Sequence, residues 1–274
     1  MASDEPAADR QLAIGPRVRA WRQSRGLSQF DLAVRAGFSS RHVSFIETGR
    51  TRPSREAVLA LAEVLDMPLR ERNRFLESAG FAHVFRETPL TAEEMAEARG
   101  LLQFILDRQL PYAAIVLDRH STCLQGNRAA GQLLSLLAAP SLLTKGANLL
   151  RVVFHPDGVR RFIANWPDIA THLLRRAERE MGGREDPIGS ELLEEIRGYA
   201  DASHLAAPSP AATRLQPQDL LLPIHIRRPD LELRLVSTIM TLGTPQDVTL
   251  QELRIEAFFP ADEESERSWA RLFV

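Results

Sequence analysis

The first 80 residues combine short amphipathic stretches with regularly spaced turn signals. Within each stretch, apolar residues recur at intervals of three and four, which is the spacing of one face of an α-helix. Gly26, Gly37, Gly49 and the Asp-Met-Pro sequence at 66–68 interrupt this period, and helices typically end at such residues. The pattern predicts five short helices at about residues 12–25, 28–36, 39–48, 54–66 and 68–79.

Beyond residue 91, helical periods alternate with the two-residue period of strands. A helix is followed by two short strands that meet at Arg119-His120, and Asn127 has the position of an N-cap for the next helix. Three strand-like runs come last, so we expect an antiparallel sheet with a helical insert over one face. The predicted strands are 112–118, 121–127, 219–228, 231–243 and 250–260; the predicted helices are 91–109, 128–137 and those within 157–181 and 190–199, which Gly182-Gly183 separates.

The stretch between these two patterns marks a domain boundary. Residues 80–91 have no clear period and end in a proline and a threonine that can cap the next helix, with Glu94 three residues later. We therefore expect a helical domain at 10–80, a linker at 81–95 and a mixed domain at 96–266. Residues 202–218 are rich in Ala, Ser and Pro and are expected to form a loop.

Composition is that of a soluble globular protein: 44% of the 274 residues are hydrophobic, 26% are charged, and the net charge is -2. The charge is unevenly distributed. Between Arg10 and Arg74, 13 arginines accompany six acidic residues, which leaves a net charge of +7. Such a concentration is typical of a module that binds a polyanion.

Cellular location is expected to be cytoplasmic. Cys123 is the single cysteine of the sequence, so neither an internal disulfide nor a thiolate zinc cluster can form. The leader MASDEPAAD is acidic and lacks the apolar core of a signal peptide. Apolar runs such as 133–143 are much shorter than the roughly 20 residues of a membrane-spanning helix.

The stretch RGLSQFDLAVRAGFSSRHVSFIETGR, residues 25–50, predicts two helices joined by a tight turn. Ser28 and Ser39 can cap the two helices, and Gly37 permits the turn between them. Leu32, Val43 and Ile46 fall on one side as a shared core, and Ala33 is small where the helices approach each other.

The opposite side of the second helix carries Ser40, Arg41, Ser44 and Phe45. Short hydrogen-bonding side chains and one arginine suit the edges of bases, while Phe45 could contact a thymine methyl group. Gln29, at the start of the preceding helix, has a position suited to a phosphate. The predicted DNA-binding residues are Gln29, Ser39, Ser40, Arg41, Ser44, Phe45, Arg50 and Arg52, the last two as anchors to the DNA backbone.

Residues 12–79 resemble the helix-turn-helix domain of phage repressors and Xre-type bacterial regulators, through GLSQFDLAVRAGFSSRHVSFIETGRTRPS and EAVLALAEVLDM. The resemblance implies a five-helix, lambda-repressor-like domain whose third helix enters the major groove of double-stranded DNA. It also implies that Glu47 pairs with an arginine of the first helix, here Arg22. Members of this family are expected to bind palindromic operators as homodimers.

The larger domain carries no recognisable catalytic motif: no Gly-rich phosphate loop, GxSxG elbow or HExxH helix occurs. The His120-x-x-Cys123 pair offers two ligands, too few for a metal ion. We therefore expect no enzyme, no metal and no cofactor.

The same domain resembles the ligand-binding domain of MmyB-type regulators over residues 101–266, through LPYAAIVLDRHSTCLQGNRAAGQLL, IANWPDIA and STIMTLGTPQDVTLQELRIEAFFPADEES. The resemblance implies a PAS-like α+β domain that encloses an apolar cavity for a fatty-acid-like or other lipophilic effector and supports dimerisation. Trp166 and His225 are the predicted ligand-binding residues. Asn127 is expected to cap a helix, with ligand contact as the alternative.

The alternating apolar residues of the strands are equally compatible with a filled core. Two hypotheses therefore remain: a ligand-responsive DNA-binding regulator, or a DNA-binding regulator whose larger domain is a protein-interaction and dimerisation module without a ligand.

Overall fold

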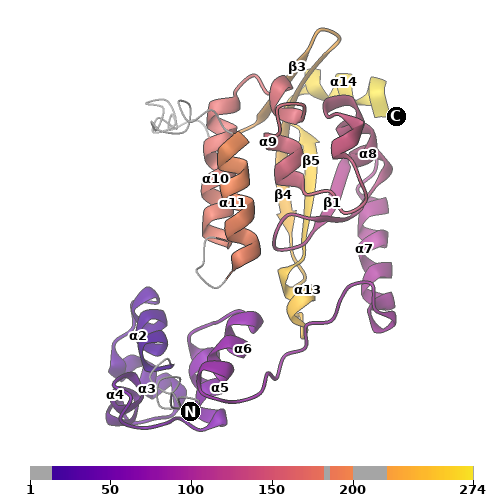
Figure 1. Cartoon of the computed structure of the whole chain (residues 1–274). Coiled ribbons are helices and arrows are strands. Elements are labelled where there is room, and N and C mark those ends of the chain that lie inside the picture. The colour runs from indigo at the N-terminus through magenta and orange to yellow at the C-terminus, as the bar shows by residue number, and fades with distance from the viewer. Residues whose placement is uncertain (1–13, 182–185, 200–220, 274) are drawn as a thin grey trace, which may run out of the picture. The chain divides into compact units, whose positions relative to one another are not determined.

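The computed structural model describes residues 14–181, 186–199 and 221–273. They divide into two compact units, and the division does not follow chain order (Figure 1). The first unit contains the chain up to Pro89 together with Gly243–Gln251, and the second contains Leu90–Leu242 and the chain from Glu252 onward.

Five helices form most of the first unit, and local signals define where they begin and end. Ser28, Ser39 and Ser54 each accept a hydrogen bond from a backbone N–H group in the first turn of the next helix. Gly37 ends one helix in the left-handed conformation, with φ of 73°, which favours glycine. The helices are α2 (Ile14–Ser24), α3 (Gln29–Ala36), α4 (Ser40–Glu47), α5 (Arg55–Val64) and α6 (Leu69–Ser78), which confirms the predicted five-helix domain.

The core of this unit lies where α2, α3, α4 and α5 meet. Val18, Leu32, Val43 and Ile46 are fully buried in it, so the apolar side chains predicted to form the shared core do so. Gly15 lets α2 approach α4 closely: a Cβ atom there would lie 2.6 Å from the carbonyl oxygen of Ile46. The first helix therefore packs directly on the backbone of the third.

The chain that follows α6 is held against that helix. Asn73, a buried residue of α6, donates a hydrogen bond from Nδ2 to the carbonyl oxygen of Phe85 at 2.7 Å. Its Oδ1 accepts the backbone N–H groups of Val84 and Phe85, both at 3.1 Å. The start of the predicted linker is thus an ordered part of the first unit.

Residues 243–251, which follow much later in the chain, complete the first unit. The backbone N–H of Val248 donates to the carbonyl oxygen of Arg86 at 2.8 Å. The N–H of Leu69, at the start of α6 where no helical carbonyl is within reach, donates to Oε1 of Gln251 at 2.6 Å. A segment that lies between two strands of the sheet in the sequence therefore supplies part of the first unit's own hydrogen bonding.

The second unit is built on a five-stranded antiparallel sheet with the strand order β2-β1-β5-β4-β3. The central strand pairs place Ile115 of β1 opposite Glu256 of β5, and Glu256 opposite Ile239 of β4. Every residue of β1 is buried, which indicates that both faces of the sheet are covered there. The strands are β1 (Ala113–Leu117), β2 (Cys123–Gly126), β3 (Ile224–Arg228), β4 (Leu231–Met240) and β5 (Arg254–Pro260).

Helices inserted between β2 and β3 cover one face of the sheet, and α10 and α11 pack side by side (Figure 1). The others include α7, which contacts β1, and α14, which contacts β4 and β5. Trp269 of α14 is buried and donates from Nε1 to the carbonyl oxygen of Pro111 at 3.0 Å. The helices of the second unit are α7 (Ala96–Arg108), α8 (Arg128–Leu137), α9 (Leu149–Phe154), α10 (Trp166–Met181), α11 (Pro187–Tyr199) and α14 (Glu263–Phe273), with 3-10 turns η1 (Glu93–Met95), η2 (Pro140–Leu142) and η3 (Val159–Phe162). The short helix α13 (Val248–Glu252) begins within the Gly243–Gln251 segment of the first unit.

Two details differ from the sequence predictions. The run predicted as a strand from residue 250 begins as α13, because Asp247 accepts the backbone N–H of Thr249 at 2.8 Å and starts a helical turn. Helices α9 and α14 were not predicted, although Asn148 caps α9 through the backbone N–H of Arg151. The acidic leader, residues 12 and 13 of the first predicted helix, Gly182-Gly183, the loop at 202–218 and the first two residues of the strand predicted at 219–228 lie outside the described residues.

Candidate DNA-binding surface and ligand cavity

Helix α4 has one buried side and one outward side. Val43 and Ile46 are fully buried, whereas Arg41 is exposed. Ser40, Ser44 and Phe45 are partly exposed on the same outward side. The helix can therefore present one face to a groove of DNA while the other holds it to the core.

Phe45 organises the cations at this surface. The guanidinium carbon of Arg41 lies 5.1 Å from the centre of the Phe45 ring, and that of Arg50 lies 5.9 Å from it. Such stacking restricts both side chains. A stacked guanidinium keeps its N–H groups in its own plane, where they can donate to phosphate or to a base edge.

Glu47 ends α4 in a buried cluster. Nε of Arg22 donates to its Oε1 at 2.6 Å, and Nη2 of Arg22 donates to its Oε2 at 3.1 Å. Burial by itself raises the pKa of Glu47, but the hydrogen bonds from Arg22 and Gln29 hold that pKa below its ordinary value. The predicted pairing of Glu47 with Arg22 is confirmed, and its role is to join α2 to α4.

Three of the predicted DNA-binding residues, Gln29, Ser39 and Arg52, also form hydrogen bonds within the unit. Nε2 of Gln29 donates to Oε2 of Glu47 at 2.8 Å, which fixes the orientation of its amide. Nη2 of Arg52 donates to the carbonyl oxygen of Ala79 at 3.0 Å, and its guanidinium lies over the ring of Phe81. Ser39 accepts the backbone N–H of His42 as the cap of α4.

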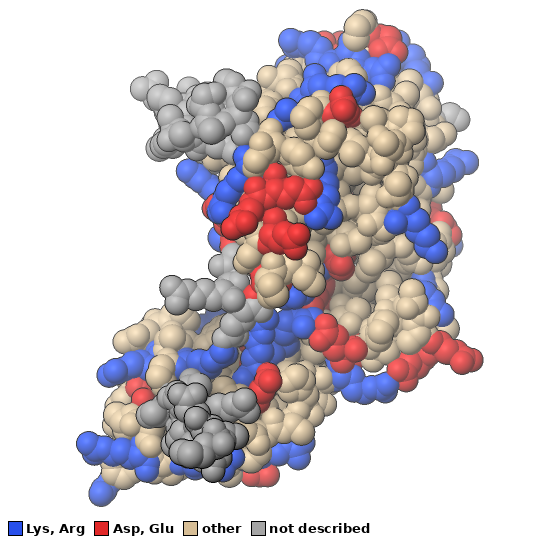
Figure 2. Space-filling view, in the orientation of Figure 1, with Lys and Arg blue, Asp and Glu red and all other residues tan. Residues whose placement is uncertain are grey.

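Basic side chains are distributed over the visible face of the first unit (Figure 2). Arg35, Arg41 and Arg50 are among its exposed residues. These arginines carry part of the positive charge of residues 10–74 on the surface, where it can act on a polyanion.

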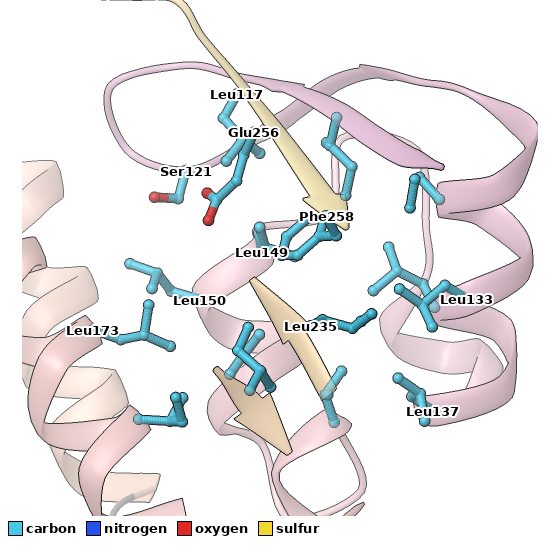
Figure 3. A pocket seen from close by; sticks show the side chains of 18 of the residues that line it. Leu117, Ser121, Leu133, Leu137, Leu149, Leu150, Leu173, Leu235, Glu256 and Phe258 are labelled. Carbon is cyan, nitrogen blue, oxygen red and sulfur yellow. The ribbon is translucent and has the colours of Figure 1, made fainter. Parts of the chain in front are cut away.

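The second unit contains a cavity between its sheet and the helices of its insert (Figure 3). The space between the lining atoms measures about 920 Å³, part of it open to solvent. Of 23 lining residues, 19 are apolar, contributed by β1, β3, β4, β5, α8, α9, α10, η3 and Ile163, the residue after η3. The cavity lining is therefore predominantly apolar.

One end of the cavity is polar. Figure 3 shows Ser121 and Glu256 near Leu117, while Leu133 and Leu137 line the opposite end. The remaining polar lining residues, Arg176 and Glu180, come from α10.

Four charged side chains form ion pairs with one another at this polar end. Nη1 of Arg176 lies 3.6 Å from Oε1 of Glu256, and its Nε donates to Glu180 at 3.1 Å. Glu180 also pairs with Arg254. The group of Arg176, Arg254, Glu180 and Glu256 contains two cations and two anions, so its formal charges cancel.

The two ligand-binding residues predicted from the sequence do not line this cavity. Trp166 packs edge-on against Phe154, with the ring centres 5.0 Å apart. His225 lies between Ile224 and Ile226, which both line the cavity, and strand alternation directs it to the opposite face. There its Nε2 lies 2.7 Å from Oε1 of Glu232.

Asn127 has the predicted capping role: its Oδ1 accepts the backbone N–H groups of Ala130 and Ala114, at 3.0 and 3.2 Å. Its Nδ2 donates to the carbonyl oxygens of Leu106 and Tyr112. The side chain thus joins α7, β1 and α8, and it is not among the residues that line the cavity.

His120 and Cys123 have separate surroundings. Nε2 of His120 lies 3.0 Å from both carboxylate oxygens of Asp186, a pairing that helps to hold the pKa of Asp186 below its ordinary value. Burial raises the pKa of the Cys123 thiol, which disfavours the thiolate that metals and oxidants require.

Sequence reasoning missed Ser121, Arg176, Glu180 and Glu256. A weak signal exists for Glu256, since it lies two residues before Phe258, on the same face of the strand, and both line the cavity. Arg176 and Glu180 are one helical turn apart, but ion pairs on exposed helix faces have the same spacing, so the sequence does not distinguish the two cases.

Within the described residues, no helix combines the length and the apolar character needed to cross a membrane. The same part of the chain contains no cluster of three or more His, Cys, Asp or Glu side chains suited to a metal ion.

Two protein families match this chain. The helix-turn-helix domain matches residues 13–75, and the MmyB-like transcription regulator ligand binding domain matches residues 98–272. Among curated proteins, no sequence matches well enough to count as a relative.

Seven chains of solved structures match. One is the restriction-modification controller protein C.AhdI from Aeromonas hydrophila, with 35% sequence identity and a TM-score of 0.22; the match covers 23% of this chain and 94% of that one.

The ligand-binding family alone spans more than half of the chain, and the helix-turn-helix family accounts for the basic unit that precedes it. The chain therefore belongs to the MmyB-like transcription regulators, proteins with a helix-turn-helix DNA-binding domain and a ligand-binding domain.

Proposed function

We propose that this regulator binds a palindromic operator as a homodimer and that a small lipophilic, fatty-acid-like effector occupies its second unit. The observation that carries the effector is the apolar cavity between the sheet and α8, α9 and α10. A protein-interaction module with a filled core would have no need for such a space.

On the DNA side, Ser40, Arg41, Ser44 and Phe45 read bases from α4 in this proposal. Arg50 and Arg52 anchor the DNA backbone, and Gln29 and Ser39 contact phosphate at the starts of their helices. The support is the outward side of α4 and the cations stacked on Phe45. Gln29 and Arg52 would use those donor groups that their internal hydrogen bonds leave available.

Dimerisation follows from symmetry in this proposal. A helix-turn-helix dimer reads two half-sites about one helical turn of DNA apart, so the operator repeats in inverted order. Leu101 and Phe104 of α7 are 48% and 56% exposed, and a contact between two copies of this helix would bury them.

Effector control requires that the effector bind the DNA-competent and DNA-incompetent arrangements with different affinities. Operator affinity should then change when the cavity fills, and by the reciprocity of linkage, operator DNA should change effector affinity by the same factor.

Native mass spectrometry of gently purified protein tests the effector. A retained mass of lipid size, together with a rise in melting temperature on adding fatty acid, is expected. Protein that retains nothing and whose melting is unaffected by lipophiles would favour the ligand-free interaction module. Selection of operator sequences from random DNA, followed by measurement of the protomers bound per site, tests the palindrome and the dimer.

A further inference from the structure

The carboxylate of Glu256 lies at the polar end of the cavity, where a bound molecule could reach it. Glu256 is 6% exposed and its side chain lines the cavity. Among the described residues, none donates a hydrogen bond to its carboxylate, and its nearest cation, Nη1 of Arg176, lies at 3.6 Å. Buried carboxylates are normally stabilised by hydrogen-bond donors. A ligand head group that donates a hydrogen bond would supply the missing one.

The hydroxyl group of Ser121 can make a second hydrogen bond to the same head group. Ser121 is buried and lines the same end of the cavity, as Figure 3 shows. Within the described residues, its hydroxyl makes no hydrogen bond, whereas its backbone is held by Asp118 and Leu149. A hydroxyl group can both donate and accept, so Ser121 and Glu256 together suit a head group that does both.

The cations of this end are already shared. Arg176 pairs with both Glu180 and Glu256, and Arg254 pairs with Glu180. A ligand carboxylate would therefore find no arginine without an acidic partner and would face Glu256 directly. Like charges in a buried site disfavour each other.

We propose that the cavity selects a lipophile with a neutral hydroxyl head group, such as a long-chain alcohol, over the fatty acid of the same length. The head group donates a hydrogen bond to Glu256 and accepts one from Ser121, and the hydrocarbon chain runs toward Leu133 and Leu137. The inference rests on the proposed binding of a lipophilic effector and specifies its polar end.

A matched pair of probes tests this selectivity in the full chain at neutral pH. The compounds 1-dodecanol and dodecanoic acid differ only in their head groups, and each is titrated against protein loaded with the neutral fluorophore N-phenyl-1-naphthylamine. The alcohol should displace the fluorophore at a concentration about tenfold lower than the acid, because the acid brings a second negative charge to Glu256.

Glu256→Gln should abolish this preference, since a glutamine amide carries no charge and can donate to a carboxylate. It also leaves Arg176 with one acidic partner fewer, which further favours the acid. Glu194→Gln removes the same charge from an exposed position of α11 and should leave the preference unchanged. Circular dichroism checks that both variants are folded.

Ser121→Ala provides a second variant that leaves the charges intact. This variant should bind the alcohol roughly fivefold more weakly, which is the effect of one lost hydrogen bond, and should bind the acid as tightly as before.

The outcomes separate the two levels of the proposal. If the acid binds as tightly as the alcohol in the unaltered protein, or if the preference survives Glu256→Gln, the head-group inference is wrong while effector binding stands. If neither compound nor the fluorophore binds, the proposed effector function fails, and this inference fails with it.

Discussion

Arg22 and Glu47 join the first and third helices of the DNA-binding unit through two hydrogen bonds, of 2.6 and 3.1 Å, and both side chains are buried. Removing Glu47 leaves the buried Arg22 without its acidic partner, whereas removing Arg22 leaves Glu47 with the more distant Arg19, whose Nε lies 3.8 Å from Oε2 of Glu47. Glu47→Gln should therefore destabilise the first unit by about 3 kcal/mol. Faster hydrogen–deuterium exchange of α2 and α4 would report the loss, and Glu63→Gln, at an exposed position of α5, should have little effect.

The same pair predicts a pH dependence. Because the folded pKa of Glu47 lies below its ordinary value of 4.5, its stabilising contribution is present at neutral pH and is lost as the pH falls through the folded pKa. The protection factors of amides in α2 and α4, which correct for the slower intrinsic exchange in acid, should fall below pH 4.5 more strongly in the unaltered protein than in Glu47→Gln. An equal fall in both proteins would assign the acid sensitivity to other groups.

In the Gly15→Ala variant, helix propensity and packing have opposite effects on stability. Alanine is the better helix former by about 1 kcal/mol, so propensity alone predicts stabilisation. A Cβ atom at this position would lie 2.6 Å from the backbone oxygen of Ile46, which cannot move aside as a side-chain end can. We expect a net loss of about 2 kcal/mol in urea unfolding. The exposed Gln23→Ala in the same helix should be neutral or slightly stabilising.

Arg41→Ala should weaken binding to the selected operator by about 1–3 kcal/mol and relax the preference at one base position, if Arg41 reads a base. The control is Arg35→Ala, which removes an exposed charge from α3, outside the predicted DNA-binding residues. Equal losses on operator and random DNA would instead make Arg41 a phosphate contact.

Asn127→Ala should destabilise the second unit without altering the head-group preference of the cavity, because Asn127 joins α7, β1 and α8 but does not line the space. The four hydrogen bonds lost suggest about 3 kcal/mol. Asn127→Ser, which keeps an N-cap acceptor but no amide donor, should recover part of the loss. A changed preference in a folded Asn127 variant would contradict a purely structural role.

Local signals in the sequence identified most of the elements because caps and periods are local properties. Ser28, Gly37 and Ser39 are sufficient to place the turn between α3 and α4, and Asn127 marks the start of α8. The pair of Arg22 and Glu47 was accessible through the resemblance to known helix-turn-helix domains. These features required no knowledge of how distant segments pack.

The cavity depends on distant pairings and was predicted less well. Glu256 faces inward because β5 pairs in register with β1 and β4, which no local pattern specifies. His225 was chosen for its chemistry, whereas the alternation of Ile224 and Ile226 determines that it faces away. Trp166 was chosen for its size, but its ring packs against Phe154 and it does not line the cavity.

Gln251 accepts the backbone N–H of Leu69, and Asp247 accepts that of Thr88, so the DNA-binding unit is assembled from two separate pieces of the chain. A fragment cut at residue 89 would retain all five helices but lose the acceptors for these N–H groups. Exchanging DNA-binding heads between regulators of this architecture would therefore require grafting the β4–β5 connection as well. In this protein, the interchangeable module of engineering and recombination is not a contiguous stretch of sequence.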